Sequence, residues 1–209
     1  MFKRNFFFIV FEGVEGTGKS FQINKLYKNL KKNKFKVIKT REPGGSHSAE
    51  KIRNLIFNKK NLHFDPLTDF YLMLASRNEH IKKTILKAKK NKQIVICDRF
   101  SDSTYAYQVV GNHIKSSINS INQKYIKGSL KPNLTIILTS DMNTISKRIK
   151  KRQNKNKFDK LSRNFYTKIQ KTFIKIAKKN KNYFTFNSSI ENNFLEKKIF
   201  DVVIKELKK

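Results

Sequence analysis

The sequence of 209 residues predicts an α/β fold in a single domain, with a five-stranded parallel sheet flanked by helices. The first observation behind this prediction is that short apolar runs alternate with longer amphipathic stretches. The second is that the runs IVIC and LTIIL are almost continuously apolar, as expected for parallel strands covered on both faces. The third is that the sequence has no internal repeat and no Pro- or Gly-rich linker, with three prolines and seven glycines in all. One domain over residues 1–209 is therefore expected.

In the first half of the chain, apolar runs predict strands and apolar residues at helical spacing predict helices. The strands are expected at Phe6–Phe11, Lys36–Thr40 and Gln93–Cys97. The helices between them are expected at Ser20–Lys32, at Ala49–Phe57 and over a long stretch near Pro66–Lys90.

The second half repeats this alternation and completes the sheet. Strands are expected at Leu134–Thr139 and Tyr183–Phe186. Helices are expected at Ser116–Gly128, Met142–Arg152, Arg163–Lys179 and Glu191–Leu207.

The composition excludes several classes of protein. Hydrophobic residues make up 38% and charged residues 30%, as is typical of an ordered globular protein. No apolar run approaches the roughly 18 residues of a membrane span, and the run ending before Glu12 is too short for a signal peptide. The single cysteine, Cys97, excludes an internal disulfide, and the four histidines show no metal-ligand spacing. A cytoplasmic protein without a transition-metal site is expected.

The formal net charge of +32 has two interpretations. A strongly basic chain could bind nucleic acid through its phosphates. Alternatively, the lysines reflect a general drift in composition, because Lys, Asn, Ile and Phe are abundant throughout. The lysines recur along the predicted helices rather than in one tail, and a solvated helix face is the usual role of such residues. We favour the second interpretation and expect no nucleic-acid partner.

The strongest local signal is GVEGTGKS, which matches the phosphate-binding loop pattern G-x-x-x-x-G-K-[ST]. Its glycines let successive backbone N–H groups point at phosphate oxygens, and the following helix adds its positive dipole end. Lys19 can reach the β- and γ-phosphates, and the Ser20 hydroxyl can bind Mg²⁺. The alternative is a Gly-rich turn with an accidental lysine, but the strand before and the helix after fit the motif. The loop comprises Gly13, Val14, Glu15, Gly16, Thr17, Gly18, Lys19 and Ser20.

A second signal is VICDRF, where Asp98 and Arg99 follow a predicted buried strand. Ligands of α/β sheets bind at the carboxyl ends of strands, so Asp98 can support Mg²⁺ there and Arg99 can meet a phosphate. The alternative is that Asp98 caps the next helix and Arg99 is exposed.

The segment TREPGG follows the second predicted strand and ends at the same edge of the sheet. Its Pro-Gly-Gly sequence enforces a specific loop, which would hold Arg41 and Glu42 near the phosphate-binding loop. A plain turn is the alternative.

The polar segment RQNKNKFD, Arg152–Asp159, lies between two predicted helices. Taken alone, it is best interpreted as an exposed connector. The functional alternative is a mobile lid over a bound nucleotide.

These motifs together resemble one family. FEGVEGTGKS, TREPGG, Leu72–Arg77, DRFSDSTYAYQ (Asp98–Gln108) and KPNLTIIL (Lys131–Leu138) occur in the order and spacing of bacterial thymidylate kinases, from about Phe8 to Ala177. The resemblance implies a P-loop NTPase fold with a short lid at about residues 152–160. It also implies phosphorylation of dTMP to dTDP with Mg²⁺ and ATP, in dTTP biosynthesis, by a cytoplasmic homodimer.

The resemblance also assigns roles to single residues. It implies that Lys19 and Ser20 serve ATP and Mg²⁺ and that Asp98 supports the metal. Arg99 would hold the acceptor phosphate, and Arg77 would reach the thymine carbonyl edge. Glu15 would face the sugar 3′-hydroxyl, Ser103 or Thr104 would read the base, and Tyr107 would lie where a ribose 2′-hydroxyl projects. The dTMP-binding set is Glu15, Glu42, Pro43, Met73, Arg77, Arg99, Ser103, Thr104, Tyr107 and Gln108.

Phosphoryl transfer needs positioning and charge cancellation more than covalent help, which suits a site rich in Lys and Arg. Some family members carry the arginine that stabilises the transition state in the phosphate-binding loop, and others carry it in the lid. Gly16 occupies the loop position here, so the lid is expected to supply the charge. We expect Arg152 to be the catalytic arginine beside Lys19, Asp98 and Arg99, with Lys155, Lys157 and Lys160 in support.

The sequence departs from the family pattern at two places that affect specificity and the lid. Met73 occupies a position that is usually an aromatic residue stacking on thymine, and DKLS (Asp159–Ser162) replaces D-R-x-E. Another nucleoside monophosphate kinase with a different base preference is therefore an alternative. A basic nucleic-acid-binding ATPase is a second alternative, although Asp98–Gln108 would have no role in one.

Overall fold

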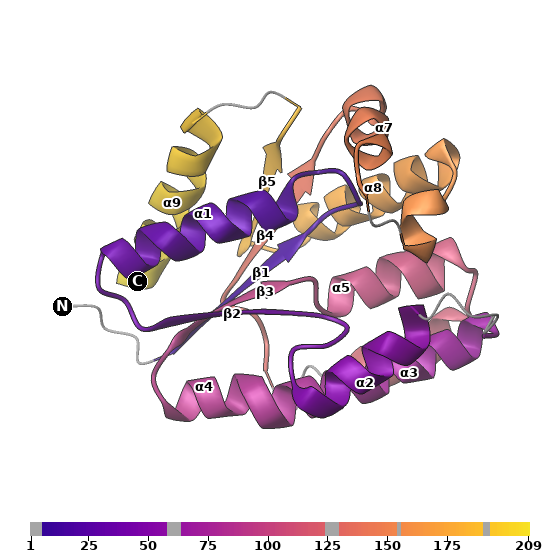
Figure 1. Ribbon diagram of the computed structural model, residues 1–209, viewed down its shortest axis with the longest axis horizontal. Coiled ribbons are helices and arrows are strands. Elements are labelled where there is room, and N and C mark those ends of the chain that lie inside the picture. Colours follow the sequence, from indigo (N-terminus) through magenta and orange to yellow (C-terminus); the bar gives the residue numbers. More distant parts are fainter. Residues whose placement is uncertain (1–5, 58–63, 124–129, 154–155, 190–192) are drawn as a thin grey trace.

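A computed structural model of the chain describes residues 6–57, 64–123, 130–153, 156–189 and 193–209. Its centre is a sheet of five parallel strands in the order β2-β3-β1-β4-β5 (Figure 1). The strands are β1 Phe7–Glu12, β2 Val37–Arg41, β3 Ile94–Asp98, β4 Leu134–Thr139 and β5 Tyr183–Asn187. The predicted α/β fold with a five-stranded parallel sheet is confirmed, and each strand lies within one residue of its predicted bounds.

Successive residues of β1 point to opposite faces of the sheet, and both faces are covered. Phe7, Ile9 and Phe11 pack with residues of α1 (Lys19–Lys32) and α9 (Asn193–Lys208). Phe8 and Val10 pack on the other face, in a cluster with residues of the segment from 81 to 88. Because neither face meets water, every position of the strand is apolar up to Glu12.

The second face is covered by helices that follow β2 and β3, seen below the sheet in Figure 1. α2 (His47–Phe57) packs against α3 (Pro66–His80), which runs through a π-helical turn, Ile81–Ile85, into α4 (Leu86–Lys90). The long helix predicted at Pro66–Lys90 is thus one continuous helical segment, and the π turn within it was not predicted.

A short helix that the sequence analysis missed follows β3. α5 (Ser101–Thr104) continues into a π-helical segment, Tyr105–Gly111. The predicted helix Ser116–Gly128 begins as a 3-10 turn, Ser116–Ile118, and residues 119–123 are helical. Its remainder lies outside the described residues.

The last part of the chain adds α7 (Met142–Lys150), a 3-10 turn at Lys157–Lys160 and α8 (Arg163–Lys178) before β5 and α9. Asp141 and Ser162 cap α7 and α8 by accepting from Thr144 N and Phe165 N. These caps explain why both helices begin where the sequence predicts. Among the described residues, no helix is long and apolar enough to cross a membrane.

The register of the sheet brings the chemically active motifs together. Phe11 of β1 and Arg41 of β2 both pair with Asp98 at the end of β3. The phosphate-binding loop after β1, the TREPGG loop after β2 and Asp98–Arg99 therefore meet at one edge, where ligands of parallel sheets bind.

Candidate active site

The loop from Gly13 to Ser20 turns tightly between β1 and α1. Gly13 has φ 141°, and a Cβ there would lie 2.3 Å from the carbonyl oxygen of Leu138. Gly16 has φ 75°, and a Cβ there would lie 2.9 Å from the carbonyl oxygen of Ile145. Both positions therefore require glycine, because other residues would be strained and would collide with the backbone of β4 or α7.

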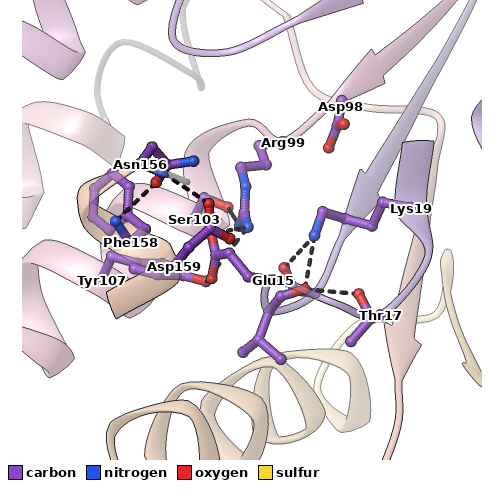
Figure 2. A network of polar contacts seen from close by, with 12 residues as sticks. Glu15, Thr17, Lys19, Asp98, Arg99, Ser103, Tyr107, Asn156, Phe158 and Asp159 are labelled. Carbon is purple, nitrogen blue, oxygen red and sulfur yellow. Dashed lines mark hydrogen bonds and ion pairs between the residues drawn. The ribbon is translucent and has the colours of Figure 1, made fainter. Parts of the chain in front are cut away.

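Lys19 begins α1 and turns its side chain back over this loop (Figure 2). Its Nζ donates to the carbonyl oxygens of Gly13 and Val14, both at 2.9 Å, and the residue is only 7% exposed. Burial, together with the nearby charge of Arg99, lowers the pKa of Lys19 from 10.5 to about 8. A buried ammonium group satisfied only by neutral carbonyls is suited to receive phosphate oxygens.

Asp98 and Ser20 place a carboxylate and a hydroxyl group next to each other at the start of α1. The Ser20 hydroxyl donates to Asp98 Oδ2 at 3.2 Å, while Asp98 Oδ1 is buried and has no hydrogen-bond partner among the described residues. A hydroxyl and an unpartnered carboxylate oxygen fit Mg²⁺, which is commonly held by few protein ligands together with phosphates. The alternative in which Asp98 caps the next helix is wrong, because the N-cap of α5 is Phe100.

Glu12 is a buried carboxyl group whose importance the sequence analysis missed. It is 0% exposed and accepts from Phe100 N at 2.9 Å, Ser103 N at 3.2 Å and Ser103 Oγ at 2.5 Å. Glu12 therefore ties the end of β1 to the start of α5. Burial, reinforced by Asp102, raises its pKa from 4.5 to about 8. Its place after a buried strand is the same signal that pointed to Asp98.

Arg99 is the centre of a polar cluster with Glu15, Ser103 and Tyr107 (Figure 2). Its φ of 70° is in the left-handed region, which turns the side chain back over the loop. It donates to Glu15 Oε1 at 2.6 Å and to Ser103 Oγ at 3.0 Å. Tyr107 donates to Glu15 Oε2 at 2.5 Å, and burial raises the pKa of Tyr107 well above 10, so its hydroxyl stays protonated.

Arg77 belongs to a second buried cluster, formed with Glu42 and His80. Arg77 Nε donates to Glu42 Oε2 at 2.7 Å, and His80 Nδ1 lies 2.9 Å from Glu42 Oε1. Burial by itself would raise the pKa of Glu42, but the charge of Arg77 and the His80 hydrogen bond outweigh it, so this pKa is lowered. Glu42 is therefore ionised, and it holds Arg77 at the cavity.

The segment predicted as a connector or lid packs on the site. Asp159, whose side chain is 0% exposed, accepts from Arg152 Nη1 at 2.6 Å. Lys157 forms an ion pair with Asp69 of α3, and the ring of Phe158 lies edge-on to that of Tyr107 at 5.4 Å. The exposed-connector interpretation is therefore incomplete for residues 156–160. Lys155 lies outside the described residues.

These groups surround a cavity of about 220 Å³. All ten residues expected to bind dTMP line it, together with Lys19, Ser20, Asp98 and Arg152; the other residues of the loop do not line it. The sequence analysis missed Phe57 and Arg53 in its lining. Arg53 donates to the carbonyl oxygen of Pro43 at 2.8 Å, and burial lowers its pKa. No motif pointed to Arg53, which reaches the site from the middle of α2.

Charge in the cavity is positive. Its lining has six basic side chains, Lys19, Arg41, Arg53, Arg77, Arg99 and Arg152, and three acidic ones, Glu15, Glu42 and Asp98. Glu15 and Glu42 are each engaged by an arginine, whereas Lys19 and Arg53 donate to backbone carbonyls. This surplus of cationic donors suits an anionic ligand with more than one phosphate.

The first strand of an all-parallel sheet leads into a glycine-rich phosphate-binding loop, and a hydroxyl and a carboxylate lie beside the loop lysine. This arrangement defines the P-loop nucleotide-binding class. A family model described as thymidylate kinase matches residues 11–199. Relatives named thymidylate kinase include one from Finegoldia magna, 40% identical over 84% of this chain and 86% of its own length. Another, from Wolbachia pipientis subsp. Culex pipiens, is 39% identical over 96% of this chain and 97% of its own.

A solved structure supports the same relationship. The crystal structure of thymidylate kinase from Ehrlichia chaffeensis matches with a TM-score of 0.75 and 32% identity, over 95% of this chain and 98% of that one. The chain belongs to the thymidylate kinase family.

Proposed function

We propose that this chain transfers the γ-phosphoryl group of Mg²⁺-ATP to dTMP and so forms dTDP, a step of dTTP biosynthesis. One observation carries the proposal: a single cavity joins Lys19 and Ser20 of the phosphate-binding loop to the Arg99–Glu15–Tyr107 and Arg77–Glu42 clusters. A donor phosphate site and a second polar pocket side by side are what transfer between two nucleotides requires. The names of the relatives agree with this activity.

The donor side consists of the loop from Gly13 to Ser20. Its backbone and Lys19 would hold the ATP phosphates, and Lys19 would exchange its two carbonyl partners for phosphate oxygens. Ser20 and Asp98 would hold Mg²⁺, which neutralises charge on the β- and γ-phosphates when bound. The unpartnered Oδ1 of Asp98 is the observation that favours this site.

The acceptor side consists of the two arginine clusters. Arg99 and Arg53 would bind the dTMP phosphate, while Glu15 and Tyr107 would meet the sugar. Arg77, with Thr104 and its neighbours, would read the base, and Met73 would form an apolar wall of the pocket. The remaining assigned residues, Glu42, Pro43, Ser103 and Gln108, line the same cavity. The acceptor phosphate is largely dianionic near neutral pH, so it needs its charge screened rather than a strong general base.

Arg152 is the group that we assign to the charge of the transition state. It lines the cavity, and the buried carboxylate of Asp159 holds its guanidinium there. Residues 152–160 would act as a lid, with Lys157 and Lys160 as further basic groups. Lys157 is engaged by Asp69, so it serves first to attach the lid to α3.

The assembly and location are also part of the proposal. We expect one kinase domain over residues 1–209, a homodimer and a cytoplasmic protein. The exposed apolar side chains Leu55 and Tyr71, on the packed helices α2 and α3, favour a contact between copies at this pair.

A nucleotide panel tests the activity directly. Release of ADP is measured with dTMP, dUMP, dCMP, dGMP and AMP as acceptors, at fixed Mg²⁺-ATP, with the Lys19→Ala variant as control. We expect dTMP to give the highest kcat/KM and the variant to lose at least about 100-fold. A preference for any purine nucleotide would refute the assignment of the base.

A further inference from the structure

Asn122 is a buried polar residue with no role in the reaction described so far. It lies in the helical segment 119–123, is 0% exposed and does not line the cavity. Its Oδ1 accepts a hydrogen bond from Arg77 Nη1 at 2.7 Å. The contact links residues 45 positions apart, and no motif predicts it.

Arg77 is held from three directions by this contact and two others. Its Nε donates to Glu42 Oε2 at 2.7 Å, and its Nη2 donates to Thr104 Oγ1 at 2.8 Å. The guanidinium carbon, Cζ, lies over the ring of Phe100, 5.2 Å from the ring centroid. A guanidinium has five N–H donors in one plane, and three bonds on its three nitrogens fix the orientation of that plane.

One N–H on each terminal nitrogen of Arg77 remains without a partner among the described residues. Arg77 is only 2% exposed, and it borders the cavity on the acceptor side. Buried N–H donors without acceptors are unfavourable until a ligand supplies acceptor oxygens. A ring carbonyl of a pyrimidine base offers such oxygens.

The orientation of Asn122 is itself set by the protein. Its Nδ2 donates to Asn119 Oδ1 at 3.1 Å and to the carbonyl oxygen of Ser101 at 3.4 Å. A flipped amide would place its NH₂ group against the guanidinium, donor facing donor. The amide therefore presents its oxygen to Arg77.

We infer that Asn122 is a positioning residue that sets the plane of Arg77 for recognition of the acceptor base; the inference rests on the proposed function. It acts without touching the substrate, by removing rotational freedom from Arg77, which lines the cavity and keeps N–H donors without a partner among the described residues. Loss of its oxygen would leave Arg77 Nη1 with two unsatisfied N–H donors and would let the guanidinium turn toward another acceptor.

The test compares Asn122→Leu, which has similar volume and no hydrogen bond, with Asn122→Asp, which keeps an acceptor oxygen. Wild-type turnover of dTMP is measured first, and its absence would refute the proposed function itself. In Asn122→Leu we expect the KM for dTMP to rise about 10- to 100-fold, with the KM for ATP within about twofold. In Asn122→Asp the KM for dTMP should stay within about threefold of wild type.

Two controls separate positioning from general damage to the fold. Asn180→Leu removes a side-chain amide whose hydrogen bond, within the described part of the chain, goes to the local carbonyl of Ile176, and it should leave both KM values unchanged. In the background of Arg77→Met, adding Asn122→Leu should change the KM for dTMP by less than about twofold, because Asn122 acts through Arg77. Where the leucine variant does not fold, Asn122→Ala replaces it.

Several outcomes would overturn the inference. One is an equal rise in both KM values in Asn122→Leu, which indicates a structural role only. A second is a rise in the KM for dTMP in Asn122→Asp that is as large as the rise in Asn122→Leu. A third is that Asn122→Leu raises the KM for dTMP as much in the Arg77→Met background as it does in the wild-type protein.

Discussion

At the scale of single residues, the buried ammonium group of Lys19 links pH to ATP binding. Its pKa of about 8 in the free protein means that the charge is lost as pH rises through 8. Phosphate oxygens favour the charged form, so ATP binding above this pH must take up a proton. The affinity for ATP therefore depends on pH in a range where ATP itself does not titrate.

We expect the dissociation constant for ATP to be nearly constant from pH 6.5 to 7.5 and to rise toward tenfold per pH unit above 8. Isothermal titration calorimetry in two buffers of different ionisation enthalpy measures both the affinity and the proton uptake. The matched control is Lys19→Arg, whose guanidinium stays charged, and its affinity should be flat over the same range. A flat wild-type profile to pH 9 would contradict the lowered pKa.

The carboxylate of Asp98 is expected to set how much Mg²⁺ the enzyme needs for activity. Asp98→Asn keeps the shape of the side chain and one oxygen but removes the charge that favours Mg²⁺. We expect half-maximal activity to need about 10- to 100-fold more Mg²⁺, measured by varying Mg²⁺ at fixed ATP. Asp201→Asn, on α9, is a control for loss of a carboxylate away from the site. An unchanged Mg²⁺ requirement would show that Asp98 does not support the metal.

The buried carboxyl group of Glu12 is expected to make the stability of the fold depend on pH. Its folded-state pKa of about 8 lies above the unfolded value of 4.5, so the native state retains a proton that the unfolded state releases. Stability is therefore lost as pH rises above 4.5, and the loss is complete above about 8. In Glu12→Gln, a neutral residue, the fall of Tm between pH 6 and pH 9 should be smaller than in wild type by several degrees, as seen by calorimetry. Parallel pH profiles for the two proteins would contradict the raised pKa.

At the scale of elements, the 3-10 turn at Lys157–Lys160 is docked by side chains from several parts of the fold. Phe158 contacts the rings of Tyr107 and Phe57, at 5.4 and 5.6 Å between centroids. Its carbonyl oxygen accepts from Tyr166 OH at 2.5 Å. The turn is thus attached to the lining of the cavity rather than standing free in solvent.

Phe158→Ala removes the ring contacts with Tyr107 and Phe57 and leaves the hydrogen bond from Tyr166 to the backbone carbonyl of residue 158. We expect kcat to fall about tenfold, because Asp159 of the same segment holds Arg152 through an ion pair. We also expect amide hydrogen exchange at residues 156–160 to become faster. Phe194→Ala is the control, since Phe194 is 58% exposed on α9. If neither kcat nor exchange changes, the aromatic contacts do not hold this turn in place.

The elements also show how far the sequence could predict the fold. The three central strands, β1, β3 and β4, were predicted within a residue because their apolar runs are nearly continuous and end at polar or charged positions. The edge strands β2 and β5 are less apolar, and their predicted bounds are also within a residue. The helix after β3 was missed, since α5 has four residues and the segment after it is π-helical, so apolar spacing of 3.6 does not hold there. Its start is fixed by Glu12, which is far away in the sequence.

At the scale of the whole molecule, the net charge of +32 acts on stability. Like charges spread over one compact chain repel one another, and salt screens that repulsion. We expect Tm to rise by several degrees between about 50 and 500 mM NaCl, since 1 kcal/mol corresponds to roughly 2–4 °C for a chain of this size. Thermal scans in NaCl and KCl should agree, and a constant or falling Tm would contradict this account.

The same charge bears on the nucleic-acid alternative. Non-specific binding to duplex DNA should be lost between about 50 and 200 mM salt, where counterion release no longer favours it. Binding with sequence preference that survives this range would favour a nucleic-acid-binding protein. Arg77 and Arg99 argue otherwise, because Arg77 is buried, the Arg99 side chain is only 17% exposed, and both line one small cavity rather than an open surface.

The resemblance to thymidylate kinases supplied most of the residues expected around the cavity, whereas the residue pattern by itself determined the sheet and the phosphate-binding loop. These features are local: a strand, a tight loop and a helix start are specified by residues within a few positions of one another. Asp98 and Arg99 could be found because the carboxyl ends of parallel strands meet at one edge.

Only the tertiary structure decided which of these side chains meet. Glu15 and Arg99 are 84 positions apart, and Asp69 and Lys157 are 88 apart, so their pairing depends on how distant strands and helices are brought together and not on any local pattern. Arg53 and Asn122 reach the site or its supports from elements that carry no motif. A side chain's place in such a network is set by burial and by the partners that satisfy it, which exist only after the chain has folded.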